Sequence, residues 1–142
     1  MATNSHTDSR VQLALNVEDI EEAVEFYSRL FDAEPHKRRP GYANFALTDP
    51  ALKLVLIQNP GKPGSLNHLG VEVASTQDVG AASRRLSDSG LDTVVEDATT
   101  CCYAVQDKVW VTAPGGERWE VYTITDDAPV VETACDNSAC CA

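Results

Sequence analysis

Residues 68–73 read His-Leu-Gly-Val-Glu-Val, and they repeat the pattern of residues 12–17, Gln-Leu-Ala-Leu-Asn-Val. Polar or small side chains alternate with aliphatic ones in both stretches, which is the two-residue period of a strand. Each stretch is followed by a side chain that favours the start of a helix, Asp19 in the first copy and Ser75 in the second. The chain is therefore predicted to contain one structural unit twice.

The pattern around each copy predicts a strand, a helix and then further strands. Apolar residues at helical spacing follow each cap, and short β-prone runs are separated by turns rich in Pro, Gly and Asp. The first copy is predicted to contain a strand at 11–17, a helix at 20–31, a basic, solvated turn at 35–41 and strands at 42–48 and 52–58. The second copy is predicted to contain strands at 67–73, 91–95, 108–112 and 118–124, a helix between Ser75 and Gly90, and a loop at 99–103.

These elements predict an α+β fold of two tandem βαβββ modules that form one curved mixed sheet around a metal cavity. The first module spans residues 10–60 and the second spans residues 66–125. Residues 1–9 are small and polar, which predicts a disordered N-terminal arm. Residues 126–142 contain no Lys or Arg, which predicts an acidic, flexible tail that carries cysteines.

Equivalent positions of the two copies identify the residues of that cavity. Gln12 corresponds to His68, and Leu56 corresponds to Glu120 when the last strands are aligned. If the copies pair about a pseudo-two-fold axis, the four positions converge, and three of them offer an amide oxygen, an imidazole and a carboxylate. Such a set with open positions suits Fe(II), Mn(II), Ni(II) or Co(II). The alternative is that His68 is structural, that Gln12 lies at the surface and that Glu120 is an exposed strand residue.

The five cysteines are unevenly placed: Cys101-Cys102 and Cys140-Cys141 are adjacent, and Cys135 stands alone. Adjacent Cα atoms lie about 3.8 Å apart, closer than the roughly 4.4–6.8 Å of most disulfides. This placement predicts reduced thiols that bind a soft ion in a cytoplasmic protein. Cys101 and Cys102 lie in a segment without a counterpart in the first copy, and a loop there could chelate one ion with both thiolates; the alternative is two small buried side chains. The tail cysteines are predicted to form an accessory soft-metal site or to be incidental.

Composition excludes several classes of partner. The 142 residues carry 22 acidic and 11 basic side chains, for a net charge of −11. This charge argues against nucleic acid, which requires clustered Lys and Arg, and against an anionic membrane surface. The longest aliphatic run, residues 54–57, is far shorter than the roughly 20 residues that cross a bilayer. No apolar segment at the N-terminus predicts a secretory signal.

The repeated βαβββ pattern, its candidate ligands and the last strand Gly-Gly-Glu-Arg-Trp-Glu-Val-Tyr at 115–122 resemble the vicinal oxygen chelate superfamily over about residues 10–125. That superfamily includes glyoxalase I, extradiol dioxygenases and bleomycin-binding proteins. Glyoxalase-like enzymes usually have a fourth ligand, which Leu56 removes. The segment 99–108, Thr-Thr-Cys-Cys-Tyr-Ala-Val-Gln-Asp-Lys, resembles the organoarsenical C–As lyases, also described as cadmium-induced proteins. Those enzymes commonly carry His where this chain has Gln12.

This resemblance implies a nonheme Fe(II) dioxygenase of extradiol type that releases arsenite from trivalent methyl or aromatic arsenicals, with dioxygen as co-substrate. Ni(II), Co(II) or Mn(II) are expected to substitute for iron. It implies that Cys101 and Cys102 bind arsenic and that Tyr103, Val105 and Lys108 line the loop or support the ligands. Two alternatives stay open, a non-catalytic protein that sequesters arsenic or cadmium and a metal-dependent thiol transferase that modifies an antibiotic. The sequence also leaves open whether two copies form a homodimer.

Overall fold

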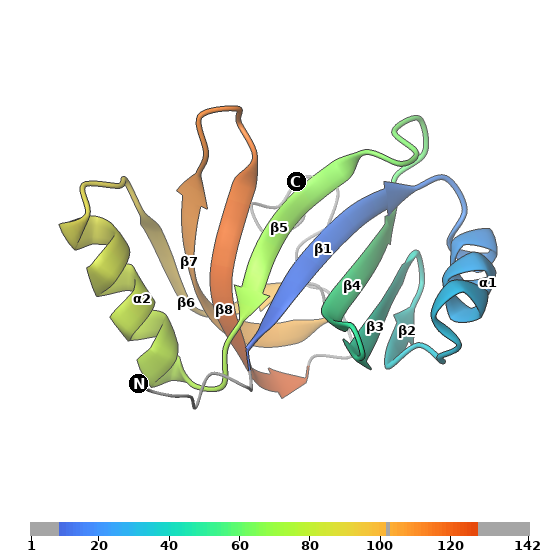
Figure 1. Ribbon diagram of the computed structural model, residues 1–142, viewed down its shortest axis with the longest axis horizontal. Coiled ribbons are helices and arrows are strands. Elements are labelled where there is room, and N and C mark those ends of the chain that lie inside the picture. The colour runs from blue at the N-terminus through green and yellow to red at the C-terminus, as the bar shows by residue number, and fades with distance from the viewer. Residues whose placement is uncertain (1–8, 102, 128–142) are drawn as a thin grey trace.

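The computed structural model describes residues 9–101 and 103–127 and contains a single curved sheet of eight strands. The strand order is β2-β3-β4-β1-β5-β8-β7-β6, so each half of the sheet comes from one half of the chain. Figure 1 shows the sheet curling between two helices that lie on opposite flanks of the molecule. The predicted α+β fold of two βαβββ modules is confirmed, with the elements β1 (Arg10–Val17), α1 (Ile20–Phe31), β2 (Lys37–Arg39), β3 (Tyr42–Thr48), β4 (Ala51–Gln58), β5 (Leu66–Glu72), α2 (Thr76–Asp88), β6 (Val94–Cys101), β7 (Ala104–Thr112) and β8 (Arg118–Asp127).

Both helices begin where the sequence predicts. The side chain of Asp19 accepts a hydrogen bond from the backbone N–H of Glu22 at 3.1 Å, and Ser75 accepts one from Asp78 at 3.2 Å. These bonds satisfy amide groups that have no partner inside the first helical turn. The apolar stripe of α1 then packs on β3 and β4, in a core that contains Val17, Ile20, Val24, Ala43, Phe45, Leu47, Leu54 and Leu56.

The two modules meet through their first strands, which run antiparallel at the centre of the sheet. Within each module the first strand also pairs in parallel with the last, β1 with β4 and β5 with β8. The sheet therefore has an approximate two-fold axis between β1 and β5. Side chains of the four central strands that point to the inner face of the sheet converge near this axis, and there they form the cavity described below.

Strand pairing corrects the predicted match of Glu120 with Leu56. Glu120 pairs with Gly70 in the second module, and Val55 pairs with Ala14 in the first. Since Ala14 and Gly70 are equivalent, the counterpart of Glu120 is Val55. A slip of one residue moves a strand side chain to the other face of the sheet, and Leu56 accordingly lies fully buried in the α1 core.

Three other predicted boundaries were wrong. Residues 37–39 form β2, an edge strand paired with β3, where a solvated turn was expected. The expected strand at 91–95 and loop at 99–103 are replaced by β6, which continues to Cys101 and pairs with Ala104 of β7. β8 extends to Asp127, so the second module ends later than residue 125 and the tail begins later than residue 126.

Residues 1–8 of the predicted N-terminal arm at 1–9, and residues 128–142 of the predicted tail at 126–142, lie outside the described residues. Among the residues that the structure does describe, neither helix is long and apolar enough to cross a membrane.

Candidate functional site

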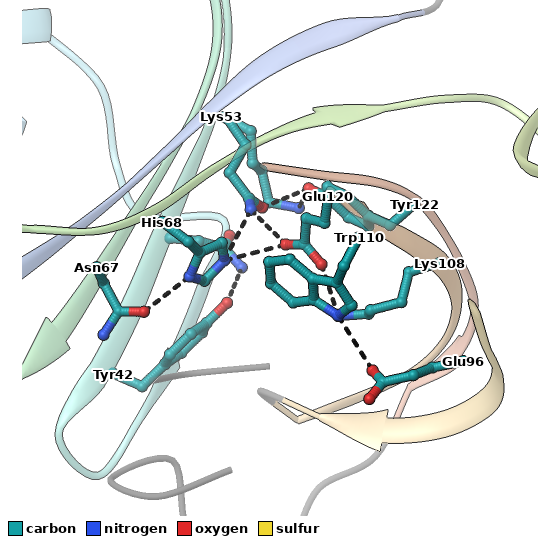
Figure 2. Close-up of polar contacts among 11 residues, drawn as sticks. Tyr42, Lys53, Asn67, His68, Glu96, Lys108, Trp110, Glu120 and Tyr122 are labelled. Carbon is teal, nitrogen blue, oxygen red and sulfur yellow. Dashed lines mark hydrogen bonds and ion pairs between the residues drawn. The ribbon is translucent and has the colours of Figure 1, made fainter. Parts of the chain in front are cut away.

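Gln12, His68 and Glu120 meet inside the sheet, each from a different strand of the central group. Gln12 Nε2 donates to Glu120 Oε2 at 2.7 Å and lies 3.2 Å from His68 Nε2. His68 Nε2 lies 3.0 Å from the same carboxylate oxygen, as Figure 2 shows. All three side chains are at least 96% buried. The fold therefore brings together the three residues that the sequence predicts as metal ligands.

Asn67 determines which ring nitrogen of His68 faces the cavity with its lone pair. The amide nitrogen of Asn67 donates to Asn16 Oδ1 at 3.0 Å, which leaves its oxygen to face His68 Nδ1 at 2.7 Å. An amide oxygen only accepts, so Nδ1 carries the hydrogen. The lone pair of the neutral ring then lies on Nε2 and points into the cavity, as in metal-ligating histidines whose second nitrogen is held by a hydrogen bond.

This arrangement fits a cation. With Nδ1 protonated, the Nε2 lone pair of His68 and the ionised Oε2 of Glu120 lie 3.0 Å apart, and the amide nitrogen of Gln12 faces both of them. A cation in the place of that nitrogen would be bound by both acceptors. In the described part of the chain, no group of three His, Cys, Asp or Glu side chains could hold a metal. A metal at this position would thus depend on the amide of Gln12 as a third protein ligand.

Lys108 keeps the carboxylate ionised. Its ammonium lies 2.7 Å from Glu120 Oε1, and both side chains are nearly fully buried. Burial raises the pKa of Glu120, but the positive charge of Lys108 and the contact with His68 outweigh it and lower the pKa to about 2. Glu120 is therefore available as an anionic ligand at any pH at which the protein is expected to work.

The remaining walls of the cavity come from both modules. The free volume at its centre is about 20 Å³, room for one water or ion. Val55 occupies the position equivalent to Glu120 and offers no ligand. The lining residues are Gln12, Lys37, Tyr42, Asn44, Lys53, Val55, His68, Ala104, Gln106, Lys108, Glu120, Tyr122 and Ile124.

The β6–β7 hairpin reaches over this cavity and contacts the first module. The ring of Tyr103 lies 5.4 Å from the ring of Tyr42, and its backbone carbonyl accepts from Lys37 Nζ at 2.9 Å. The same ammonium lies 2.6 Å from Asp127 at the end of β8. Tyr103, which follows the cysteine pair in the sequence, thus packs against the first module at the wall of the cavity.

The other predicted site residues divide into two groups. Lys108 lines the cavity, and Tyr103 packs against Tyr42 of the cavity wall. Val105 alternates with lining residues on β7 and faces away from the cavity. The side chain of Cys101, and the whole of Cys102, Cys135, Cys140 and Cys141, lie outside the described residues.

Sequence reasoning missed several polar residues around the site. Tyr122 follows Glu120 by two positions, so strand alternation alone would have placed it on the same face. Lys53 lies two positions before Val55 and was hidden by the error in register. Asn67 had no signal beyond its place next to His68, and Lys37 was assigned to a solvated turn.

Comparison with known proteins agrees with this geometry. The profile of the Glyoxalase/Bleomycin resistance protein/Dioxygenase superfamily matches residues 9–121. The cadmium-induced protein CadI of Mycobacterium tuberculosis is 68% identical over 120 residues, which are 84% of this chain and 79% of that protein. A trivalent organoarsenical cleaving enzyme of Thermomonospora curvata is 60% identical over 134 residues, 94% of this chain and 88% of that protein. An extradiol ring-cleaving dioxygenase from B. fuscum has a similar fold, with a TM-score of 0.62, 19% identity, and coverage of 84% of this chain and 33% of that one.

Proposed function

Because the chain belongs to the glyoxalase/bleomycin resistance protein/dioxygenase superfamily, we propose that it is an Fe(II)-dependent dioxygenase that cleaves the carbon–arsenic bond of trivalent organoarsenicals and releases arsenite. The relative from Thermomonospora curvata is named for cleaving trivalent organoarsenicals, and it matches nearly the whole chain. The extradiol ring-cleaving dioxygenase has a similar fold, which is therefore compatible with dioxygen chemistry. The expected substrates are methylarsenite and trivalent aromatic arsenicals. The protein is expected to act on them in the cytoplasm.

One observation carries this proposal: Tyr103, the residue that follows Cys101-Cys102 in the sequence, contacts Tyr42 and Lys37, which line the cavity of His68 and Glu120. Trivalent arsenic is thiophilic, and two thiolates can replace both hydroxyl groups of R–As(OH)₂. A pair of thiols at the β6–β7 hairpin would hold arsenic close to the cation position. Such proximity can lower a barrier by several kcal/mol, on the order of 7–11 in the best oriented cases.

Each residue has a distinct part in this function. Gln12, His68 and Glu120 would hold the metal, and Fe(II) when bound supplies the electrons that reduce dioxygen. Lys108 holds Glu120 in its anionic form through the 2.7 Å ion pair, and Asn67 aims the lone pair of His68 into the cavity.

The test is speciation of arsenic after the protein is incubated with Fe(II) and methylarsenite, with and without air. Inorganic arsenite that forms only in air supports the proposal. Methylarsenite that stays bound but uncleaved would favour sequestration of arsenic or cadmium, consistent with the name of the mycobacterial relative. A product that forms without dioxygen and requires an added thiol would favour a thiol transferase. His68→Ala is the matched control, because it removes a ligand and leaves both cysteines in place.

A further inference from the structure

The hydroxyl of Tyr122 is directed to the amide of Gln12. Tyr122 Oη donates to Gln12 Oε1 at 2.5 Å, and the two side chains are 99% and 96% buried. Tyr122 stands two residues after Glu120 on β8, so both side chains reach the same cavity, as Figure 2 shows. Tyr122 therefore contacts a candidate metal ligand directly.

The neighbours of this pair fix the direction of its hydrogen bonds. Lys53 Nζ lies 3.5 Å from the Tyr122 oxygen, and an ammonium only donates. The phenol hydrogen is consequently free to go to the oxygen of Gln12. At the other end of the amide, the carboxylate of Glu120 only accepts, and it faces the nitrogen of Gln12 at 2.7 Å. Both ends of the amide thus select the same orientation, with oxygen toward Tyr122 and nitrogen toward Glu120.

This orientation is the wrong one for a ligand. An amide binds a cation through its oxygen, whereas its nitrogen has no available lone pair. Gln12 must reverse its amide before it can serve a metal beside His68 and Glu120, and reversal breaks the bond from Tyr122. Gly70 leaves space for the turn, because a Cβ at this position would lie 3.1 Å from the Gln12 nitrogen and 3.0 Å from Glu120.

We propose that Tyr122 is a positioning residue that holds Gln12 with its nitrogen inward in the metal-free protein, and that metal binding is coupled to reversal of this amide. Lys53 stabilises this orientation because it donates to the Tyr122 oxygen, so the phenol hydrogen stays directed to Gln12. The inference rests on the proposed function only in requiring that a divalent metal binds between His68 and Glu120.

The first test uses the metal-free full chain and the side-chain NH₂ signals of Gln12 in a ¹H–¹⁵N spectrum, identified by their loss in Gln12→Ala. In the wild type we expect two well separated signals with slow solvent exchange. Tyr122→Phe should speed exchange about threefold to tenfold, as expected for the loss of one buried hydrogen bond. Tyr42→Phe, which removes another hydroxyl from the cavity wall, should leave the signals in place. Equal exchange in wild type and Tyr122→Phe would overturn the proposal.

The second test is a Co(II) titration followed by equilibrium dialysis. Tyr122→Phe should bind Co(II) about threefold to tenfold more tightly, because the metal no longer competes with the phenol for the amide oxygen. The same change in a Gln12→Ala background should have no effect. Weaker binding by Tyr122→Phe, or an effect that persists without Gln12, would overturn the proposal. If Tyr122→Phe fails to fold, Lys53→Met weakens the same hold and should also tighten binding.

These outcomes separate the inference from the proposed function. A wild-type protein that binds no Co(II), or that binds it equally well as His68→Ala, contradicts the proposed metal site itself. Normal Co(II) binding that depends on His68 but is unchanged in Tyr122→Phe contradicts only the role of Tyr122.

Discussion

Single residues determine the chemistry of this cavity through their immediate neighbours. Glu120 stays anionic in a site without bulk water because Lys108 lies 2.7 Å away. His68 presents Nε2 because Asn67 holds Nδ1. Without these two neighbours, a buried carboxylate would be expected to take up a proton and a neutral histidine could present either nitrogen. Of the three proposed ligands, His68 and Glu120 are thus prepared before any metal arrives.

The first prediction at this scale concerns the ligands. We expect His68→Ala and Glu120→Ala each to weaken Co(II) binding at least a hundredfold, because each removes a charged or strongly basic donor from a site with few ligands. Gln12→Ala should weaken it less, about tenfold or below, since its amide is a neutral donor. Equilibrium dialysis measures all three, with Asn44→Ala on the same cavity wall as the control. Full Co(II) affinity in His68→Ala would place the metal elsewhere.

The second prediction concerns Cys102. Cys102→Ser should abolish tight binding of methylarsenite, since one thiolate cannot chelate arsenic, while Co(II) affinity stays within about twofold. Paired titrations with methylarsenite and Co(II) on the same preparation provide the measurement. Retained arsenical affinity would mean that the vicinal pair is structural. A parallel loss of Co(II) affinity would instead make the cysteines metal ligands and favour sequestration.

At the scale of elements, duplication made the order of strands and helices predictable, but the exact register was not. The match of Leu56 with Glu120 came from aligning Leu-Thr-Asp-Pro at 47–50 with Val-Thr-Ala-Pro at 111–114. That alignment is one residue out of step with the strand pairing, because turn sequences can be shared while the strands after them differ in phase. Because side chains alternate between the two faces of a strand, an error of one residue assigns every side chain of that strand to the wrong face. The length of the β6–β7 hairpin was also missed, although Thr99 and Thr100 favour strands, because its counterpart in the first copy, β2–β3, has a first strand of three residues where β6 has eight.

The corrected register makes a prediction about β4. Val55→Glu should add a carboxylate to the cavity opposite Glu120 and tighten Ni(II) or Co(II) binding about tenfold or more. Leu56→Glu should instead prevent folding, since it buries a charge in the apolar core beneath α1. Metal titration and circular dichroism of the two variants distinguish the registers. A folded Leu56→Glu protein with raised metal affinity would restore the alignment expected from sequence.

The end of β8 makes a second prediction at the same scale. Truncation after Asp127 should leave thermal stability unchanged, because the removed residues follow the last strand. Truncation after Ile124 should lower the Tm by several degrees, since it removes the pairing of residues 126 and 127 with β7 and the contact of Asp127 with Lys37. Differential scanning calorimetry compares them, and equal Tm values would show that this part of β8 contributes nothing to stability.

The molecule as a whole carries a net charge of −11 at pH 7, so two opposing effects govern its stability in acid. Protonation of exposed carboxylates relieves repulsion as the pH falls toward 5. Asp107 acts in the opposite direction. It accepts from the Thr76 hydroxyl and from the backbone N–H of Ala98, both at 2.7 Å, and these bonds lower its pKa. Through them it joins the start of α2 to the bulge from which the hairpin extends.

The sign of this effect follows from linkage. A carboxyl whose pKa is lower in the folded chain stabilises it above the unfolded pKa, about 3.9 for Asp, and this stabilisation is lost as the pH falls through the folded value. We therefore expect the urea midpoint to hold or rise from pH 7 to 5 and to fall below about pH 4. Asp107→Asn retains an acceptor for Ala98 but cannot titrate, so its midpoint should fall less steeply below pH 4 while starting lower at pH 7. Urea unfolding of both proteins at matched ionic strength measures the difference. Parallel curves across this range would mean that Asp107 has the same pKa in the folded and unfolded chains, and that the hydrogen bonds at the base of the hairpin do not depend on its charge.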